Sequence, residues 1–324
     1  MPFSIDSLRI DCALEADRIG DMLRRTLRET HRKGIVLGLS GGIDSSVTAA
    51  LAVRALGAAR VFGIFMPEAE SDAESLRLGQ LLAAHLGIRS TLEDISPALI
   101  ALDCYRRRNE AVASVIPEFT PEWKFKIVLP DASHTGLSFY SVVARAPDGR
   151  EVKARLPLDA YLAIIAATNF KQRVRKTVEY HWADRMNFAV AGTPNRLEYD
   201  QGFFVKQGDG ASDIKPIAHL YKTQVYAMAA FLGIPAEIHA RLPTTDTYSL
   251  PQGQDEFYFS LPFAKLDLCL YGKNHAVAPD EVAAAAGLTT AQVMHAFKDI
   301  DNKRAATRYQ HMRPVLIEEV VDVR

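Results

Sequence analysis

The chain has 324 residues, a formal net charge of −1 at pH 7 and 48% hydrophobic residues, which allows a substantial buried core and excludes a general nucleic-acid-binding surface. No apolar run approaches the roughly 20 residues of a membrane helix, and the first residues lack a signal-peptide core, so we expect no membrane partner. Three scattered cysteines form no metal-binding spacing and suit a reducing compartment, which predicts a cytoplasmic protein.

The first two hundred residues alternate helical and strand patterns. This alternation predicts an α/β fold, a Rossmann-like parallel sheet flanked by helices with right-handed crossovers. The carboxyl ends of its strands should share one edge, where open α/β sheets bind ligands. The predicted elements are a helix over 7–31, strands over 35–39, 60–66, 88–95 and 187–192, and helices after 42, over 71–86 and over 156–182.

Residues 121–156 break the alternation. Two segments, 124–129 and 138–145, have strand-like patterns, and Pro147-Asp148-Gly149 is a strong turn signal. We predict a β-hairpin or three-stranded meander inserted into a single domain that spans 1–324. The insert is a dimer contact, a lid or decoration, and the sequence does not decide between them.

Two other segments have simple interpretations. Arg106-Arg107-Arg108 predicts a solvated helix face. The chain from 280 onward predicts helices over 281–286 and 290–297, followed by an Arg/His-rich segment over 304–313.

Residues 38–46 read Gly-Leu-Ser-Gly-Gly-Ile-Asp-Ser-Ser, between a strand and a helix. Glycines let the backbone approach a ligand, and the first N–H groups of the helix are free to bind an anion such as phosphate. The spacing matches neither the Gly-x-x-x-x-Gly-Lys-Ser/Thr loop nor Gly-x-Gly-x-x-Gly. Instead, Ser-Gly-Gly-x-Asp-Ser resembles the pyrophosphate loop of the N-type ATP pyrophosphatases.

A second group of motifs lies further along the chain. Its segments are Asn-Phe-Lys-Gln-Arg-Val-Arg at 169–175, Gly-Thr-Pro-Asn-Arg-Leu-Glu at 192–198, the glycine-rich stretch 202–213, Lys215-Pro216-Ile217, Lys222, Leu242-Pro243-Thr244 and Gln254-Asp255-Glu256. With the glycine turn, these segments resemble the ammonia-dependent NAD synthetase family over about residues 34–270. The resemblance implies an adenine nucleotide alpha hydrolase-like fold. It also implies an ATP-dependent ligase that adenylates the nicotinate carboxylate of deamido-NAD and amidates it with ammonia.

The resemblance also implies roles for individual residues. Asp44 and Glu198 would hold Mg²⁺, and Asp44, Asp209 and Lys222 would be catalytic. Asp209 is either an electrostatic or ammonia-site residue or a turn carboxylate between two glycines. Deamido-NAD would contact Arg173, Lys206, Asp213 and His311. ATP would contact Gly38, Leu39, Ser40, Gly41, Gly42, Ile43, Asp44, Ser45, Thr193, Lys222 and Thr244.

The resemblance further implies a homodimer. The chain has no room for a glutamine-hydrolysing domain, so free ammonia or a partner glutaminase would supply nitrogen. Three alternatives stay open: activation of a different carboxylate, activation of a tRNA base, and a non-catalytic ATP-binding sensor. Pro194, Leu197 and Met312 depart from the family pattern. The aromatic stretch 246–262 could stack on a nicotinate or adenine ring or pack in the core.

Overall fold

The structure is a computed structural model that describes residues 3–128, 140–241, 248–250, 252–253, 258–259, 261–318 and 320. Its centre is a four-stranded parallel sheet in the order β3-β2-β1-β7, which confirms the predicted α/β fold. All residues of β1 and β2 except the last of β1 are buried, because helices cover both faces of the sheet. The strands are β1 (Ile35–Gly38), β2 (Val61–Phe65), β3 (Arg89–Leu92) and β7 (Ala189–Val190).

The helices of the first half follow local capping signals. Asp11 caps the first long helix by accepting hydrogen bonds from the amides of Ala13 and Leu14, both at 3.0 Å. The helix after β2 ends where Gly87 takes the left-handed conformation at φ 63°. These elements are η1 (Ile5–Leu8), α1 (Cys12–Glu29), α2 (Ile43–Leu56), η2 (Ala58–Arg60), α3 (Ala73–Leu86), α4 (Ser96–Ala101) and α5 (Cys104–Ala113).

The predicted insert is a three-stranded antiparallel meander in the order β4-β5-β6. Gly149 turns the chain between the last two strands with φ 90°, as the Pro-Asp-Gly signal predicts. The inward side chains of β4 and β5 form a separate apolar cluster with Ile164 and Tyr248. The strands are β4 (Lys124–Val128), β5 (Ser141–Arg145) and β6 (Glu151–Arg155).

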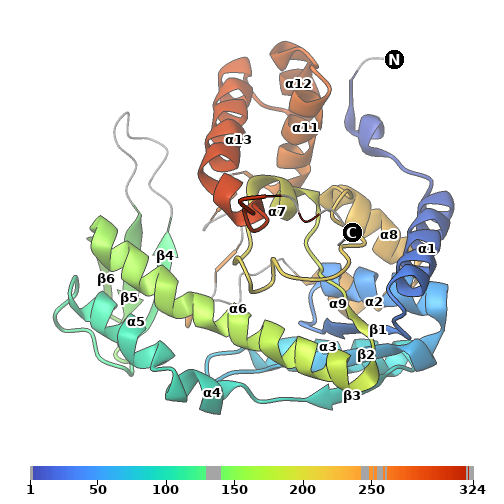
Figure 1. Cartoon of the computed structure of the whole chain (residues 1–324). Coiled ribbons are helices and arrows are strands. Elements are labelled where there is room, and N and C mark those ends of the chain that lie inside the picture. Colours follow the sequence, from blue (N-terminus) through green and yellow to red (C-terminus); the bar gives the residue numbers. More distant parts are fainter. Residues whose placement is uncertain are drawn as a thin grey trace.

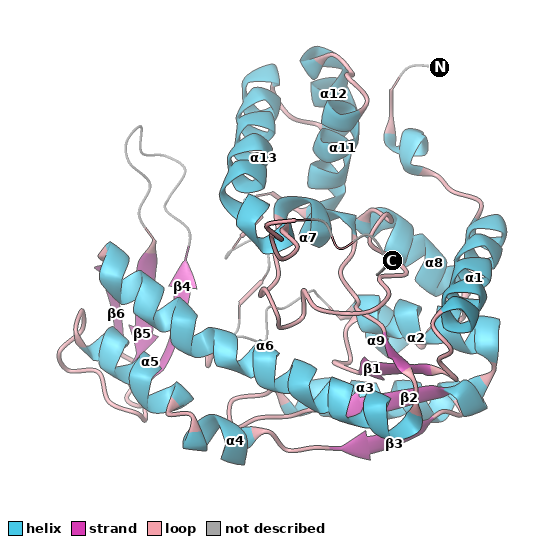
Figure 2. Ribbon diagram, in the orientation of Figure 1, coloured by secondary structure: helices cyan, strands magenta, loops and turns pink. Residues whose placement is uncertain are grey.

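One long helix, α6 (Leu158–Met186), connects the two sheets. At about 1.5 Å per residue it is roughly 44 Å long. Figure 1 shows it running from the inserted sheet to the parallel sheet, and Figure 2 shows the strands as two separate groups near its two ends. The helix continues four residues past the predicted end and stops where Asn187 adopts φ 55°.

The rest of the chain is mostly helical. α8 and α9 pack against α2 beside the parallel sheet, whereas α11, α12 and α13 pack on one another in a helical group at the top of Figure 1. The predicted helix over 290–297 is too short, because a single helix continues through the Arg/His-rich segment to His311. The elements are α7 (Arg196–Gln201), α8 (Lys222–Phe231), α9 (Ala236–Ala240), α11 (Phe263–Asn274), α12 (Pro279–Ala286) and α13 (Thr290–His311).

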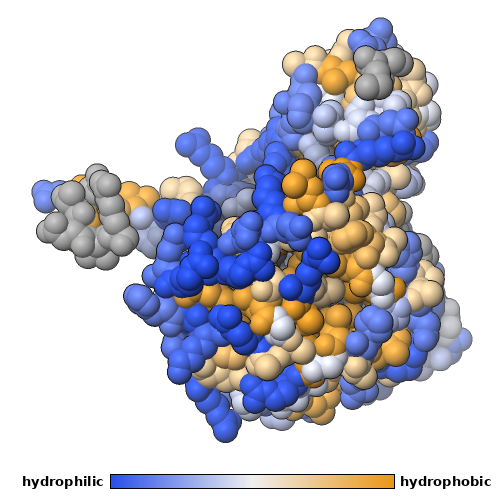
Figure 3. Space-filling view, turned by 90° about the vertical axis from the view of Figure 1, so that its right-hand side faces the viewer, coloured by the Kyte–Doolittle hydropathy of each residue, from blue (hydrophilic) through white to orange (hydrophobic). Residues whose placement is uncertain are grey.

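The surface carries mixed side chains. Figure 3 shows hydrophobic and hydrophilic patches interleaved over one face of the molecule. Within the described part of the chain, every helix is too short or too polar to cross a bilayer.

Candidate active site

The glycine turn connects β1 to α2 and leaves an anion site open at the start of that helix. Gly42 caps α2 without a side-chain hydrogen bond, and a Cβ there would meet only the Ser40 hydroxyl, at 3.3 Å. The hydroxyls of Ser40 and Ser45 lie 3.1 Å apart. Because the first N–H groups of a 14-residue helix lack intrahelical partners and carry partial positive charge, this turn suits phosphate.

Gly41 lets this turn pack closely against α3. Its φ is +71°, and a Cβ there would lie 2.5 Å from the Ser75 carbonyl and 2.9 Å from the Leu78 Cβ, both in α3. Only glycine satisfies both the backbone conformation and the close approach.

We expect Gly41→Ala to destabilise the protein by clearly more than the roughly 1–2 kcal/mol that a left-handed conformation costs an alanine. The matched control is Gly87→Ala, since Gly87 also has a positive φ but has nothing within 4 Å of its Cβ position. Urea unfolding of both variants measures the difference. Equal losses would show that the contact with α3 has no energetic effect.

The turn opens into a cavity of about 580 Å³ beneath the helical group. Residues of the turn, the end of β2, one face of α6 and the segments after β7 line it together. Of the sequence-predicted residues, the lining includes Gly38, Leu39, Ser40, Gly42, Ile43, Asp44, Ser45, Arg173, Thr193, Glu198, Lys206, Asp209 and Lys222. Thr244 lies outside the described residues.

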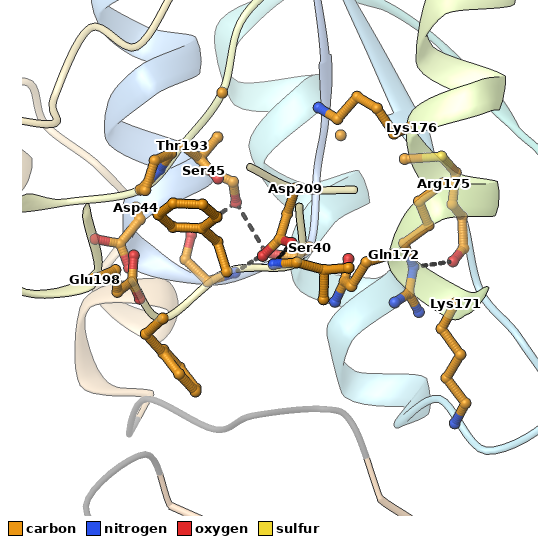
Figure 4. A pocket seen from close by; sticks show the side chains of 18 of the residues that line it. Ser40, Asp44, Ser45, Lys171, Gln172, Arg175, Lys176, Thr193, Glu198 and Asp209 are labelled. Atoms are coloured by element: carbon orange, nitrogen blue, oxygen red, sulfur yellow. Dashed lines mark hydrogen bonds between the residues drawn. The ribbon is translucent and has the colours of Figure 1, made fainter. Parts of the chain in front are cut away.

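Asp44 sits at the centre of a polar cluster at one end of this cavity. The Lys222 ammonium donates to its Oδ2, and the Asn195 amide donates to its Oδ1 at 3.0 Å. Figure 4 shows the side chains of Asp44 and Glu198 next to each other. Burial alone would lower the pKa of Lys222, but the nearby charges of Asp44 and Glu198 outweigh burial and raise it, so the lysine stays charged.

Two neighbouring groups position this cluster. The Asn195 side-chain oxygen caps α7 by accepting from the Leu197 backbone amide at 3.0 Å, while the backbone N–H of Asn195 donates to Glu198 Oε2 at 3.1 Å. Buried Asp267, from α11, accepts from the amides of Lys222 and Thr223 at 3.2 and 2.7 Å and so fixes the start of α8. Sequence reasoning missed both roles. Asn195 belongs to the motif at 192–198, whereas no sequence pattern around Asp267 indicates a functional residue.

The cluster fits a hard divalent cation. Among the described residues, no group of three His, Cys, Asp or Glu side chains could hold a metal ion. Asp44 and Glu198 form a smaller group of two carboxylates, whose two negative charges face the single positive charge of Lys222. Mg²⁺ commonly binds one or two carboxylates and takes its remaining oxygens from phosphates and water, so the pair suits Mg²⁺ beside the phosphate turn.

A second charged group lines the cavity below Gly38. Lys176 donates to Glu179 Oε2 at 2.6 Å, and a Cβ on Gly38 would lie 3.0 Å from Glu179 Oε1. Asp209 accepts from the Val205 amide at 2.7 Å, and burial raises the pKa of its carboxyl despite the opposing charge of Lys176. Figure 4 shows Asp209 beside Ser40, in the middle of the site. The turn formed by Gly208, Asp209 and Gly210 therefore places the Asp209 carboxylate in the cavity.

The predicted substrate residues fall into two groups. Arg173 donates to the Lys206 carbonyl at 3.3 Å, and the Lys206 ammonium donates to the Tyr309 carbonyl at 3.0 Å, so both lie at the cavity. Asp213 is outside the lining, where its carboxylate accepts from the Val190 amide and the Tyr180 hydroxyl. His311 packs edge-on against Phe204 and Tyr199, near the cavity wall.

The prediction of a solvated face for the arginine cluster is wrong for one residue. The Arg106 side chain is 56% exposed, but that of Arg108 is only 4% exposed and donates to Glu70 at 2.5 Å. Lys171, which lines the cavity, joins the same network through Glu68 and Glu70 at 2.9 and 2.8 Å. This network cannot be predicted from the sequence of the helix, because the carboxylates lie about 40 to 100 residues away from their basic partners.

The fold and the site define the chain as an α/β protein with a glycine turn suited to phosphate at the carboxyl edge of its sheet. The chain belongs to the NAD synthase family, whose model matches residues 15–115 and 152–314. It is 57% identical to the NH₃-dependent NAD⁺ synthetase of Rhizobium meliloti, over 99% of this chain and 96% of that protein. It is 33% identical to the Thermotoga maritima protein of the same name, over 76% and 83%.

Solved structures share the fold. The NH₃-dependent NAD synthetase of Campylobacter jejuni superposes with a TM-score of 0.63 at 22% identity, over 96% of this chain and all of that one. The NMN synthetase of Francisella tularensis gives 0.64 at 20% identity, over 95% and 99%. At these identities the likeness establishes the architecture alone, in agreement with the sheet order described above.

Proposed function

We propose that the protein is an ATP-dependent, amide-forming ligase that makes NAD. ATP adenylates the nicotinate carboxylate of deamido-NAD, releasing pyrophosphate, and ammonia then displaces AMP. One observation carries this proposal: the glycine turn, Asp44, Glu198 and Lys222 meet in a single cavity that is large enough for a small-molecule substrate. The names of the similar proteins support it.

The chemistry accounts for the charged groups. A carboxylate accepts ammonia poorly until it carries a good leaving group, which AMP provides. The expulsion of pyrophosphate builds charge on phosphate oxygens, so donors placed in advance accelerate the step. The N–H groups at the start of α2 and the Lys222 ammonium would supply these donors. Asp44 and Glu198 would hold Mg²⁺, which neutralises phosphate charge when bound.

The other predicted site residues have roles that depend on the same proposal. Thr193 would contact ATP, and Thr244 would contact phosphate. Arg173 and Lys206 would bind deamido-NAD, since a guanidinium suits carboxylates and phosphates. We assign Asp209 to the ammonia side of the site, because its carboxylate lies in the cavity beside Ser40. Contacts of Asp213 and His311 with the substrate remain predictions.

The setting of the enzyme is part of the proposal. We propose that residues 1–324 act as one domain, that the protein is a homodimer, and that ammonia comes free or from a partner glutaminase. The three cysteines are free thiols, which supports a cytoplasmic location.

The deciding experiment incubates purified protein with ATP, Mg²⁺, ammonium and deamido-NAD and follows AMP and NAD together. We expect the two products in equal amounts. A parallel reaction replaces deamido-NAD with the deamido form of NMN, which tests the alternative of a different carboxylate. AMP or amide formed only in that reaction would overturn the choice of substrate. If neither reaction forms AMP, the protein is not a ligase for these substrates, and the alternative of a non-catalytic ATP-binding sensor is favoured.

A further inference from the structure

We propose that the inserted sheet gives the active site a nucleobase subsite, in which an adenine ring stacks on Tyr140 and Tyr161. Tyr140 directly precedes β5 of the insert, and Tyr161 lies in the first turn of α6. Their rings are 4.6 Å apart and inclined by only 11°. Both residues line the cavity that contains the phosphate turn. The inference rests on the proposed function and extends it to the role of the insert.

The subsite lies at the far end of the cavity from the phosphate turn. One face of α6 lines the cavity along its length, from Tyr161 through Ile165, Thr168 and Gln172 to Glu179. Tyr161 and Glu179 are 18 positions apart on the helix, which at about 1.5 Å per residue is roughly 27 Å. Glu179 lies beside Gly38 at the turn, so Tyr161 marks the opposite end. A dinucleotide that lies along α6 with its reacting end toward the turn would place its adenine toward the tyrosines.

The chemistry of this end suits a flat, uncharged ring. Tyr140, Tyr161 and Tyr258 line it with ring surface, and the rings of Tyr140 and Tyr161 stack on each other. Burial raises the pKa of both phenols, so they remain neutral donors and acceptors. A planar base can extend a pair of parallel rings, and hydroxyls beside it can pair with ring nitrogens. Adenine occurs in both ATP and deamido-NAD. Because the roughly 27 Å along α6 is longer than an extended ATP, the adenine of deamido-NAD is the expected ring.

The insert holds Tyr140 firmly in this position. Inward residues of β4 and β5, among them Phe125 and Val142, are fully buried against Ile164 of α6. The family model leaves residues 116–151 unmatched, so Tyr140 comes from outside the part shared with the whole family. We therefore infer that the insert adds a recognition surface to a catalytic centre that the rest of the chain provides.

The test compares Tyr140→Ala with two controls. Tyr140→Phe keeps the ring and removes the hydroxyl, and Trp123→Ala loosens the apolar core of the insert without altering the cavity lining. Stacking of a base on an aromatic ring is worth about 1–3 kcal/mol, or roughly 5- to 150-fold in affinity. We expect Tyr140→Ala to raise the KM for deamido-NAD by about 10-fold, with kcat within about threefold of the wild type, and Tyr140→Phe to retain most of the affinity.

The two substrates are varied separately, because this identifies the source of the ring. A higher KM for deamido-NAD supports the subsite. A higher KM for ATP alone would show that the tyrosines do not hold the adenine of the dinucleotide and would overturn the inference. The inference is wrong if Tyr140→Ala changes neither KM, or if Trp123→Ala changes them equally. If the wild type makes no NAD, the proposed function fails. Calorimetric binding of ATP and deamido-NAD to wild type and Tyr140→Ala then decides the subsite: weaker binding of deamido-NAD supports it, and equal binding overturns it.

Discussion

Asp44→Asn is expected to abolish turnover, with kcat falling by about 10³-fold or more. The carboxylate lies between the Lys222 ammonium and the side-chain amide of Asn195, at the start of the helix that follows the glycine turn. An asparagine has nearly the same shape but cannot balance a buried lysine or bind Mg²⁺ with a full charge. The substitution therefore removes the electrostatic contribution of the site while keeping its shape. Steady-state production of AMP and NAD measures the loss.

Stability should change far less than activity in this variant. Glu198 remains as a counter-charge for Lys222, so we expect a cost of about 1–3 kcal/mol in urea unfolding and a folded protein at 25 °C. Asp17→Asn is the matched control, since Asp17 also pairs with a basic side chain, Arg54, but is 66% exposed and lies on α1 away from the cavity. It should leave both quantities unchanged. Near-normal kcat in Asp44→Asn would remove this residue from the catalytic machinery.

The parts of the site that a local pattern encodes could be predicted from the sequence. The strand, the paired glycines and the start of α2 form one continuous segment, so the turn follows from residue order and glycine conformations. The meander follows equally from alternation and a Pro-Asp-Gly turn. Its function did not follow, because the stacking of Tyr140 on Tyr161 depends on how the insert packs against α6.

Contacts between distant segments could not be predicted in this way. Lys222 and Asp44 were each assigned by resemblance, but their direct contact joins residues 178 apart in the sequence. Asp267 positions Lys222 across 45 residues, and its helical surroundings give no sign of it. Arg108 is a further example. A run of three arginines on a helix predicts solvent exposure, and the burial of Arg108 follows only from its contact with Glu70, which the sequence does not reveal.

The buried arginine allows a matched test of that network. We expect Arg108→Met to destabilise the protein by about 3–5 kcal/mol, because it breaks a buried ion pair with Glu70. Arg106→Met, two residues earlier on α5, should cost less than about 1 kcal/mol, since its pairs with Asp103 and Glu110 are exposed. Urea unfolding at pH 7 compares the two. The double variant Arg108→Met/Glu70→Gln should recover part of the loss, because it removes the unbalanced charge as well.

The stability gap between wild type and Arg108→Met should also depend on pH. Burial alone would raise the pKa of Glu70, but Lys171 and Arg108 outweigh burial and hold that pKa below its usual 4.5. A carboxyl whose pKa is lowered by folding contributes its full stability above about pH 4.5 and loses it as pH falls through the folded-state pKa. Removing Arg108 reduces that lowering, so the gap should be widest near pH 7 and narrow below pH 4.5. A gap that stays constant across this range would mean that Arg108 stabilises the fold through its contact with the Phe125 ring, at 5.0 Å, and not through its ion pair with Glu70.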